Sequence, residues 1–129
     1  MDKKRQKDMD FEIEFFEGIL SQAPDFIEAL VAIGDLYTGK GWYEKGLAVD
    51  QRLSGLRPDD PFILYNLACS YSLINDIPRS LSTIKSAIRM GYQHFEYLER
   101  DPDLTNLRQD ERFKLFLSHL RKKKLPQVK

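Results

Sequence analysis

The sequence has only one cysteine, Cys69, among its 129 residues. An internal disulfide needs two cysteines and is therefore excluded, and a lone thiol suits a reducing compartment. No apolar run approaches the ~20 residues that a membrane-spanning helix requires. The charged amino-terminal stretch is not followed by the apolar core of a secretory signal. These absences predict a cytoplasmic location without membrane insertion.

Residues suited to catalysis or metal binding are also scarce. The two histidines, His94 and His119, have no spacing to Cys69 or to a carboxylate that would indicate a metal site. A glycine-rich phosphate loop is missing, since Gly39 and Gly41 interrupt a helical pattern instead. We therefore expect no enzymatic activity, no metal and no cofactor. Cys69 itself is expected to be a small buried or half-buried apolar residue.

The chain has no net charge, because 20 basic residues balance 20 acidic residues. The charges are nevertheless unevenly distributed: residues 1–7 carry a net +3, residues 121–129 a net +5, and residues 8–120 the remaining −8. An acidic body is a poor nucleic-acid surface, which needs positive charge to displace counterions. We expect no nucleic-acid partner for the body, and we expect the two basic segments to be solvated tails.

Two similar segments occur 34 residues apart. Pro24 and Tyr37 in the first segment correspond to Pro58 and Tyr71 in the second. Between them, Leu-x2-Ile-Gly-x2-Tyr at residues 30–37 matches Leu-x2-Leu-Ala-x2-Tyr at residues 64–71. An internal repeat of this length predicts stacked copies of one unit, because a single unit cannot bury its own apolar face.

Each unit has the pattern of two helices. Apolar residues recur at helical spacing in residues 27–38 and 43–54, and again in residues 62–74 and 79–90. Glycines at 39 and 41 separate the helices of the first unit, and the prolines at 58 and 61 end that unit. Strand-like alternation of any useful length is missing, so the sequence predicts an all-α fold.

A 34-residue helix–turn–helix unit with this motif and a closing proline resembles the tetratricopeptide repeat (TPR). Gly34 and Ala68 are small where the two helices of a unit would cross, and Tyr37 and Tyr71 would fill the space between units. The sequence departs from the TPR pattern in the second helix of the first unit, where Asp50 replaces the usual aromatic residue. The resemblance implies a right-handed α-solenoid.

The resemblance divides the chain into consecutive segments. They are a basic tail at 1–7, a half repeat at 8–24, repeats at 27–60 and 61–94, a cap at 95–120, and a basic tail at 121–129. The cap carries the pattern D-P-D-L-x2-L-R, which is similar to the segment that closes many bacterial TPR arrays. Its last helix would cover the final apolar face, so residues 8–120 form one predicted domain.

In TPR arrays the first helix of every unit lines a concave groove. The resemblance therefore implies a partner-binding surface made of Glu28, Val31, Asp35, Thr38, Phe62, Tyr65, Asn66, Cys69 and Ser72. This surface suits a peptide with apolar anchors and a basic residue. The alternative is an ordinary exposed helix side, with Phe62 touching the cap. A carboxylate clamp of the chaperone-binding type is not expected, because Val31 and Asp35 stand where lysine and asparagine are needed.

The predicted amino-terminal helix is apolar over more of its circumference than one neighbour requires. One side carries Met9, Ile13, Phe16 and Leu20, and the adjoining side carries Phe11, Phe15 and Ile19. We expect the second side to be covered by another chain, as in a weak homodimer, or by the C-terminal tail.

The sequence thus predicts a non-catalytic protein–protein interaction module or assembly adaptor that binds a peptide or helix in the concave groove. An alternative stays open. The chain could be a tether whose basic C-terminal tail binds an acidic lipid or nucleic-acid surface.

Overall fold

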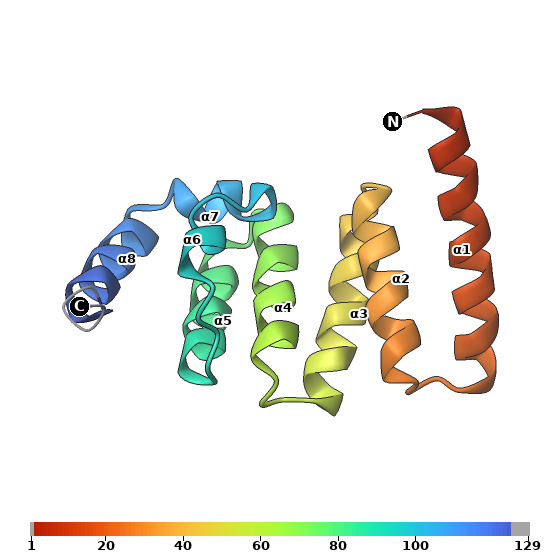
Figure 1. Ribbon diagram of the computed structural model, residues 1–129, viewed down its shortest axis with the longest axis horizontal. Helices are drawn as coiled ribbons and strands as arrows, with labels where there is room; N and C mark the ends of the chain where they lie inside the picture. The colour runs from red at the N-terminus through yellow and green to blue at the C-terminus, as the bar shows by residue number, and fades with distance from the viewer. Residues whose placement is uncertain (1, 125–129) are drawn as a thin grey trace.

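The computed structural model describes residues 2–124, and every regular element among them is helical. The elements are α1 (Lys3–Gln22), α2 (Ile27–Gly39), α3 (Tyr43–Leu56), α4 (Pro61–Leu73), α5 (Ile77–Arg89), α6 (Phe95–Leu98), the 3-10 helix η1 (Pro102–Leu104), α7 (Thr105–Arg108) and α8 (Glu111–Lys124). From α1 to α5 each helix packs on the next one in the sequence. Figure 1 shows them side by side in a row that has α1 at one end of the molecule and α8 at the other.

The small residues of the repeat lie where the two helices of a unit approach each other. A methyl group at Gly34 would lie 3.2 Å from Val49 Cγ1, and one at Gly46 would lie 2.8 Å from Thr38 Oγ1. In the second unit, Ala68 has no exposed surface, and the Ser80 hydroxyl donates to the Ala68 carbonyl at 2.8 Å. Small side chains therefore permit the helix pairs α2–α3 and α4–α5 to pack closely.

The same turn ends the first helix of both units. Gly41 and Asn75 have positive φ values of 81° and 64°. The amide that follows each of them donates to the Tyr37 or Tyr71 carbonyl, at 2.8 Å and 2.9 Å respectively. This hydrogen bond closes a Schellman motif, in which glycine or asparagine is favoured at the left-handed position. The 34-residue period thus extends to the backbone of the turns.

The C-terminal cap folds back onto α4 and supplies much of the largest core cluster. Leu98, Leu104, Leu107 and Phe113 have no exposed surface, and they pack with Ala68 and Ile84 of the second unit. Before α8 begins, η1 packs on α4, and α7 packs on α4 and α5, at the upper ends of these helices in Figure 1. The predicted capping helix corresponds to α8, which covers the last apolar face of the array.

The two segments expected to be tails are helical in their described parts. Helix α1 begins at Lys3, because the Asp2 side chain accepts the Arg5 amide at 2.7 Å and caps the helix. Its first turns also contact α2, since Lys40 donates to the Gln6 side chain at 2.6 Å. Helix α8 continues to Lys124. Helices α1 and α8 therefore extend across the segment bounds predicted at residues 7 and 121, and residues 125–129 lie outside the described part of the chain.

Candidate functional site

A hollow of about 300 Å³ lies between α2 and α4. It is lined by Asp35, Thr38, Gly39, Asp50, Asn66, Cys69, Ser70, Leu73 and Asp103. Helix α2 supplies one wall, α4 the other, α3 supplies Asp50, and η1 supplies Asp103. Below, "the acidic hollow" means this set of residues.

Three carboxylates and no basic side chain line the acidic hollow. Burial raises the pKa of Asp50 to about 6, although the Ser70 hydroxyl donates to this carboxylate and opposes the shift, and the charge of Asp35 raises it further. Burial also raises the pKa of Asp35. The pKa of Asp103 is raised by burial, and then by the charges of Asp101 and Asp35. A cation placed here would relieve the repulsion among these carboxylates.

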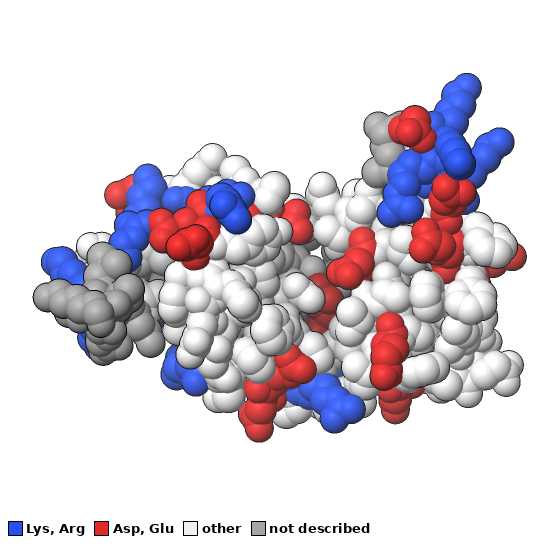
Figure 2. Space-filling model, viewed as in Figure 1, with Lys and Arg blue, Asp and Glu red and all other residues white. Residues whose placement is uncertain are grey.

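The space-filling view is consistent with this distribution. On the face drawn in Figure 2, acidic side chains surround the recess near the middle of the molecule, where α2, α3 and α4 lie in Figure 1. On the same face, Lys and Arg side chains lie toward the two ends of the molecule, most densely at the amino-terminal end of α1, and along its lower edge. A basic segment of a partner would therefore meet complementary charge at the middle of this face.

Four of the predicted groove residues border the acidic hollow, namely Asp35, Thr38, Asn66 and Cys69. Asp50 and Asp103 were not predicted to line the groove. Asp50 could have been suspected, because a carboxylate replaces an aromatic residue of the repeat pattern at that position. Asp103 comes from the cap, and its position depends on how the cap folds back.

The predicted groove is wrong for Tyr65 and Ser72, which the cap buries. The Tyr65 ring stacks on Tyr92 with centroids 4.2 Å apart, and its hydroxyl donates to Asp101 at 2.6 Å. Ser72 is fully buried, and its hydroxyl oxygen accepts the Leu107 amide at 3.1 Å. The chain's own C-terminal segment therefore uses the polar groups on this part of α4.

Cys69 is buried, as expected for a small apolar residue, and it borders the acidic hollow. Its sulfur lies 3.8 Å from Asp101 Oδ2. Burial raises the pKa of the thiol well above its ordinary value. The side chain therefore stays a thiol near neutral pH and lacks the thiolate that a nucleophile requires.

The remaining predicted groove residues lie along the rim. Glu28 is exposed. Val31 is half-buried and packs against the core cluster of Leu30, Leu53 and Ile63. Phe62 stays 56% exposed, but its ring lies against those of Tyr92 and His94, at centroid distances of 6.0 Å and 5.8 Å. Tyr92 and His94 precede the segment predicted as the cap, residues 95–120, so the contact of Phe62 with the cap stays a prediction. Phe62 does not line the acidic hollow.

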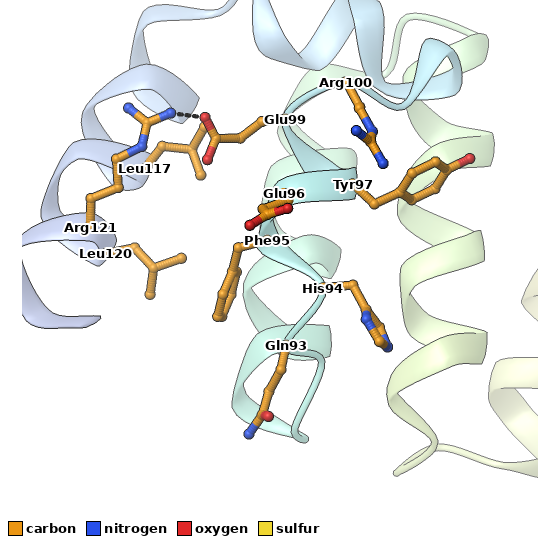
Figure 3. Close-up of a pocket in the computed structure, with 10 residues that line it drawn as sticks. All are labelled: Gln93, His94, Phe95, Glu96, Tyr97, Glu99, Arg100, Leu117, Leu120 and Arg121. Atoms are coloured by element: carbon orange, nitrogen blue, oxygen red, sulfur yellow. Dashed lines mark hydrogen bonds and ion pairs between the residues drawn. The ribbon is translucent and has the colours of Figure 1, made fainter. Parts of the chain in front are cut away.

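A second hollow of about 670 Å³ lies within the cap. Its walls are residues 93–97, 99 and 100 on one side and Leu117, Leu120 and Arg121 of α8 on the other. Figure 3 shows Phe95 and Leu120 facing each other across the gap, and an ion pair between Glu99 and Arg121 bridges it. The sequence assigned these apolar residues to packing and did not indicate the hollow.

The described residues show neither a metal site nor a membrane span. Between residues 2 and 124, no three His, Cys, Asp or Glu side chains are arranged to hold a metal ion. Within the same residues, every helix is too short or too polar to cross a membrane.

Comparison with known proteins identifies the fold. No protein-family model matches the sequence. A curated relative, a chloroplastic protein from Arabidopsis thaliana, is 32% identical over 80 residues, which cover 60% of this chain. This chain spans only 24% of the length of that relative. A likeness to so small a part of a protein carries none of its activity to this chain.

Among solved structures, the chain is similar to MamA (residues 41 to the end) from Desulfovibrio magneticus RS-1, a TPR-containing protein. The TM-score is 0.75 at 18% sequence identity, covering 98% of this chain and 71% of that one. The likeness confirms the predicted all-α, right-handed α-solenoid of the TPR type. At this identity it shows the fold alone.

Proposed function

We propose that the protein is a non-catalytic adaptor that binds a peptide or helix of another protein on its concave face, with a basic side chain in the acidic hollow. The observation that carries the proposal is the hollow itself: three carboxylates and no cation converge from three helical elements of the array. TPR-type solenoids present such a face as an extended binding surface, which agrees with this interpretation.

The size and the chemistry of the acidic hollow favour a lysine or an arginine. A volume of about 300 Å³ accommodates one or two side chains of a ligand, and not a whole folded element. A guanidinium could donate to two carboxylates at once, which strengthens the contact and fixes its direction. Thr38 and Asn66 add hydroxyl and amide groups that could hydrogen-bond to the ligand backbone.

The cap limits how much of the concave face a ligand can use. Tyr65 and Ser72 are buried beneath the cap and cannot contact a ligand. The binding surface therefore consists of the groove residues of the first unit, Asp35 and Thr38, together with Asn66 and Asp103. Exposed Glu28 extends this surface along α2. We therefore propose a short ligand whose affinity depends on charge more than on aromatic anchors.

The test is a screen of immobilised random nonapeptides, followed by titration of a selected peptide. We expect the selected peptides to contain a lysine or arginine whose replacement by glutamine weakens binding at least about tenfold. Asp35→Asn is expected to weaken binding at least about threefold, while Asp59→Asn, at an exposed carboxylate outside the acidic hollow, leaves it unchanged. Binding should strengthen as pH rises through about 6, because Asp50 becomes ionised.

Chemical-shift mapping locates the bound peptide independently. The proposal requires the largest changes at the amides around Asp35 and Asn66. Changes centred on Lys85 and Arg89, which belong to α5 on the other side of the second unit, would show that the concave face is not the binding surface. Selected peptides without any basic residue would contradict the role of the acidic hollow.

The tether remains the alternative proposal. Lys122 and Lys123 are exposed at the end of α8, which supports contact with an acidic surface. Flotation with vesicles that contain phosphatidylserine tests it: the tether requires binding that falls steeply with added salt. Absence of flotation at low salt would exclude a lipid tether.

A further inference from the structure

The side of α4 that borders the acidic hollow also carries an exposed aromatic ring. Phe62, Asn66, Cys69 and Leu73 follow each other at helical spacing, which places them in one line along the helix. Asn66, Cys69 and Leu73 line the acidic hollow, whereas Phe62 lies one turn before Asn66 and is 56% exposed. The surface of the acidic hollow therefore continues along α4 to an exposed phenylalanine.

The segment after the second unit places two more exposed rings on the same side. The rings of Phe62 and His94 lie 5.8 Å apart, from centroid to centroid. His94 is exposed and Tyr97 is 47% exposed, and Figure 3 shows both side chains pointing toward α4. Phe95, between them in the sequence, points toward α8 instead. Below, "the aromatic ledge" means Phe62, His94 and Tyr97.

Tyr97 also connects the aromatic ledge with the carboxylates of the cap. Its pKa is raised by the charge of Asp101, then by burial and by the charge of Asp103. The phenol of Tyr97 is therefore within electrostatic reach of Asp103, which lines the acidic hollow. The aromatic ledge thus adjoins the acidic hollow both along α4 and from the cap.

We propose that the aromatic ledge binds an aromatic side chain of the same partner segment whose basic side chain enters the acidic hollow. The segment is extended, and its basic and aromatic residues are two or three positions apart. This inference rests on the proposed function, because the basic residue holds the segment beside the ledge. It adds a second determinant, which selects one kind of basic segment among many.

The spacing of the two ligand residues follows from the geometry of α4. At a rise of about 1.5 Å per residue, Asn66 lies about 6 Å and Cys69 about 10 Å along the helix axis from Phe62. An extended chain advances about 3.3 Å per residue, so these distances correspond to two or three residues of the ligand. The exposed amide of Asn66 lies between the two ends. It can bond to the backbone groups that an extended segment leaves free and a helix does not.

An aromatic ligand side chain suits three exposed rings. Aromatic pairs with centroids about 4.5–7 Å apart are stabilised beyond the burial of their area, because ring edges and faces carry opposite partial charges. Phe62 is already held against Tyr92 and His94, at centroid distances of 6.0 Å and 5.8 Å. Its side chain therefore has little freedom left to lose when a ligand binds.

Nonapeptide arrays with fixed residues test the inference. One set carries an arginine and a phenylalanine at every spacing that the length allows, and a second set carries the arginine alone. The other positions vary among uncharged, non-aromatic residues. We expect binding at least about fivefold stronger than with arginine alone when phenylalanine is two or three positions away. Phe62→Ser should remove this gain. Leu115→Ser, the matched control, loses a 60% exposed side chain of α8 and should keep the gain.

Tyr97→Ser tests the aromatic ledge from the cap and should also reduce the gain, with circular dichroism showing that each variant is folded. A gain that both folded variants retain overturns the inference. So does wild-type binding that requires arginine and is weakened by Asp35→Asn but is indifferent to phenylalanine; the proposed function would then still stand. A gain only at the longer spacings of a helical ligand overturns the extended segment. Absence of arginine-dependent binding in both sets overturns the proposed function and this inference together.

Discussion

Replacing Tyr65 with phenylalanine removes one oxygen from the contact that holds the cap onto α4. The Tyr65 hydroxyl donates to Asp101 Oδ2 at 2.6 Å, and Asp101 is itself only 4% exposed. The stacking of the ring on Tyr92, with 7° between the planes, does not need the hydroxyl. In the variant, the other carboxylate oxygen of Asp101 would still accept the hydrogen bond from the Asp103 amide, which is 3.0 Å long. Loss of a buried hydrogen bond to a carboxylate costs about 1.5–3 kcal/mol of unfolding free energy.

Urea and thermal unfolding measure this loss. For a chain of 129 residues, that cost corresponds to a decrease in Tm of about 5–12 °C. Tyr71→Phe is the matched control, because its oxygen only accepts a 3.2 Å hydrogen bond from Gln51 at an exposed position. The control should change stability by less than about 0.5 kcal/mol. If Tyr65→Phe unfolds as wild type does, the hydroxyl does not hold the cap in place. The explanation given for the burial of Tyr65 beneath the cap would then be wrong.

The remaining predictions concern the repeat packing and the buried carboxylate. Gly34→Leu and Ala68→Leu should each lower the unfolding free energy by about 1–3 kcal/mol, because the new side chain has no space at the helix crossing; thermal melts equal to wild type would contradict the packing. In the folded chain the pKa of Asp50 is raised from 3.8 to about 6, which means that folding disfavours the ionised carboxylate. The unfolding free energy should therefore fall as pH rises from about 4 to about 6. Asp50→Asn should flatten this decrease, and an unchanged pH profile in urea titrations would show that Asp50 is not its source.

Local patterns in the sequence were sufficient to predict the repeat. Helical spacing, small residues at Gly34 and Ala68, and large residues at Tyr37 and Tyr71 all act within one unit or between adjacent units. Such contacts depend on residues fewer than about 40 positions apart, which a 34-residue period records directly. For the same reason the left-handed turn recurs, with Gly41 and Asn75 at matching positions.

The candidate site was predictable only in part, because the cap lies over the groove. Asp35, Thr38 and Asn66 follow from the geometry of the first helices, and they do border the acidic hollow. The burial of Tyr65 and Ser72 depends on contacts with Asp101 and Leu107, which lie 36 and 35 residues further along the chain. The cap is not a copy of the repeat, so the period holds no information about where it folds.

The sequence by itself determined the helical units, their order and the turns between them, since these depend on local propensity and on contacts between neighbours. It also revealed the two apolar sides of α1, because residue spacing alone places side chains around a helix. Only the tertiary structure decided which part of the concave face stays open and brought Asp103 of the cap beside Asp35 and Asp50. Their pKa values are raised chiefly by burial, and burial is a property of the folded packing that no single segment of the chain contains.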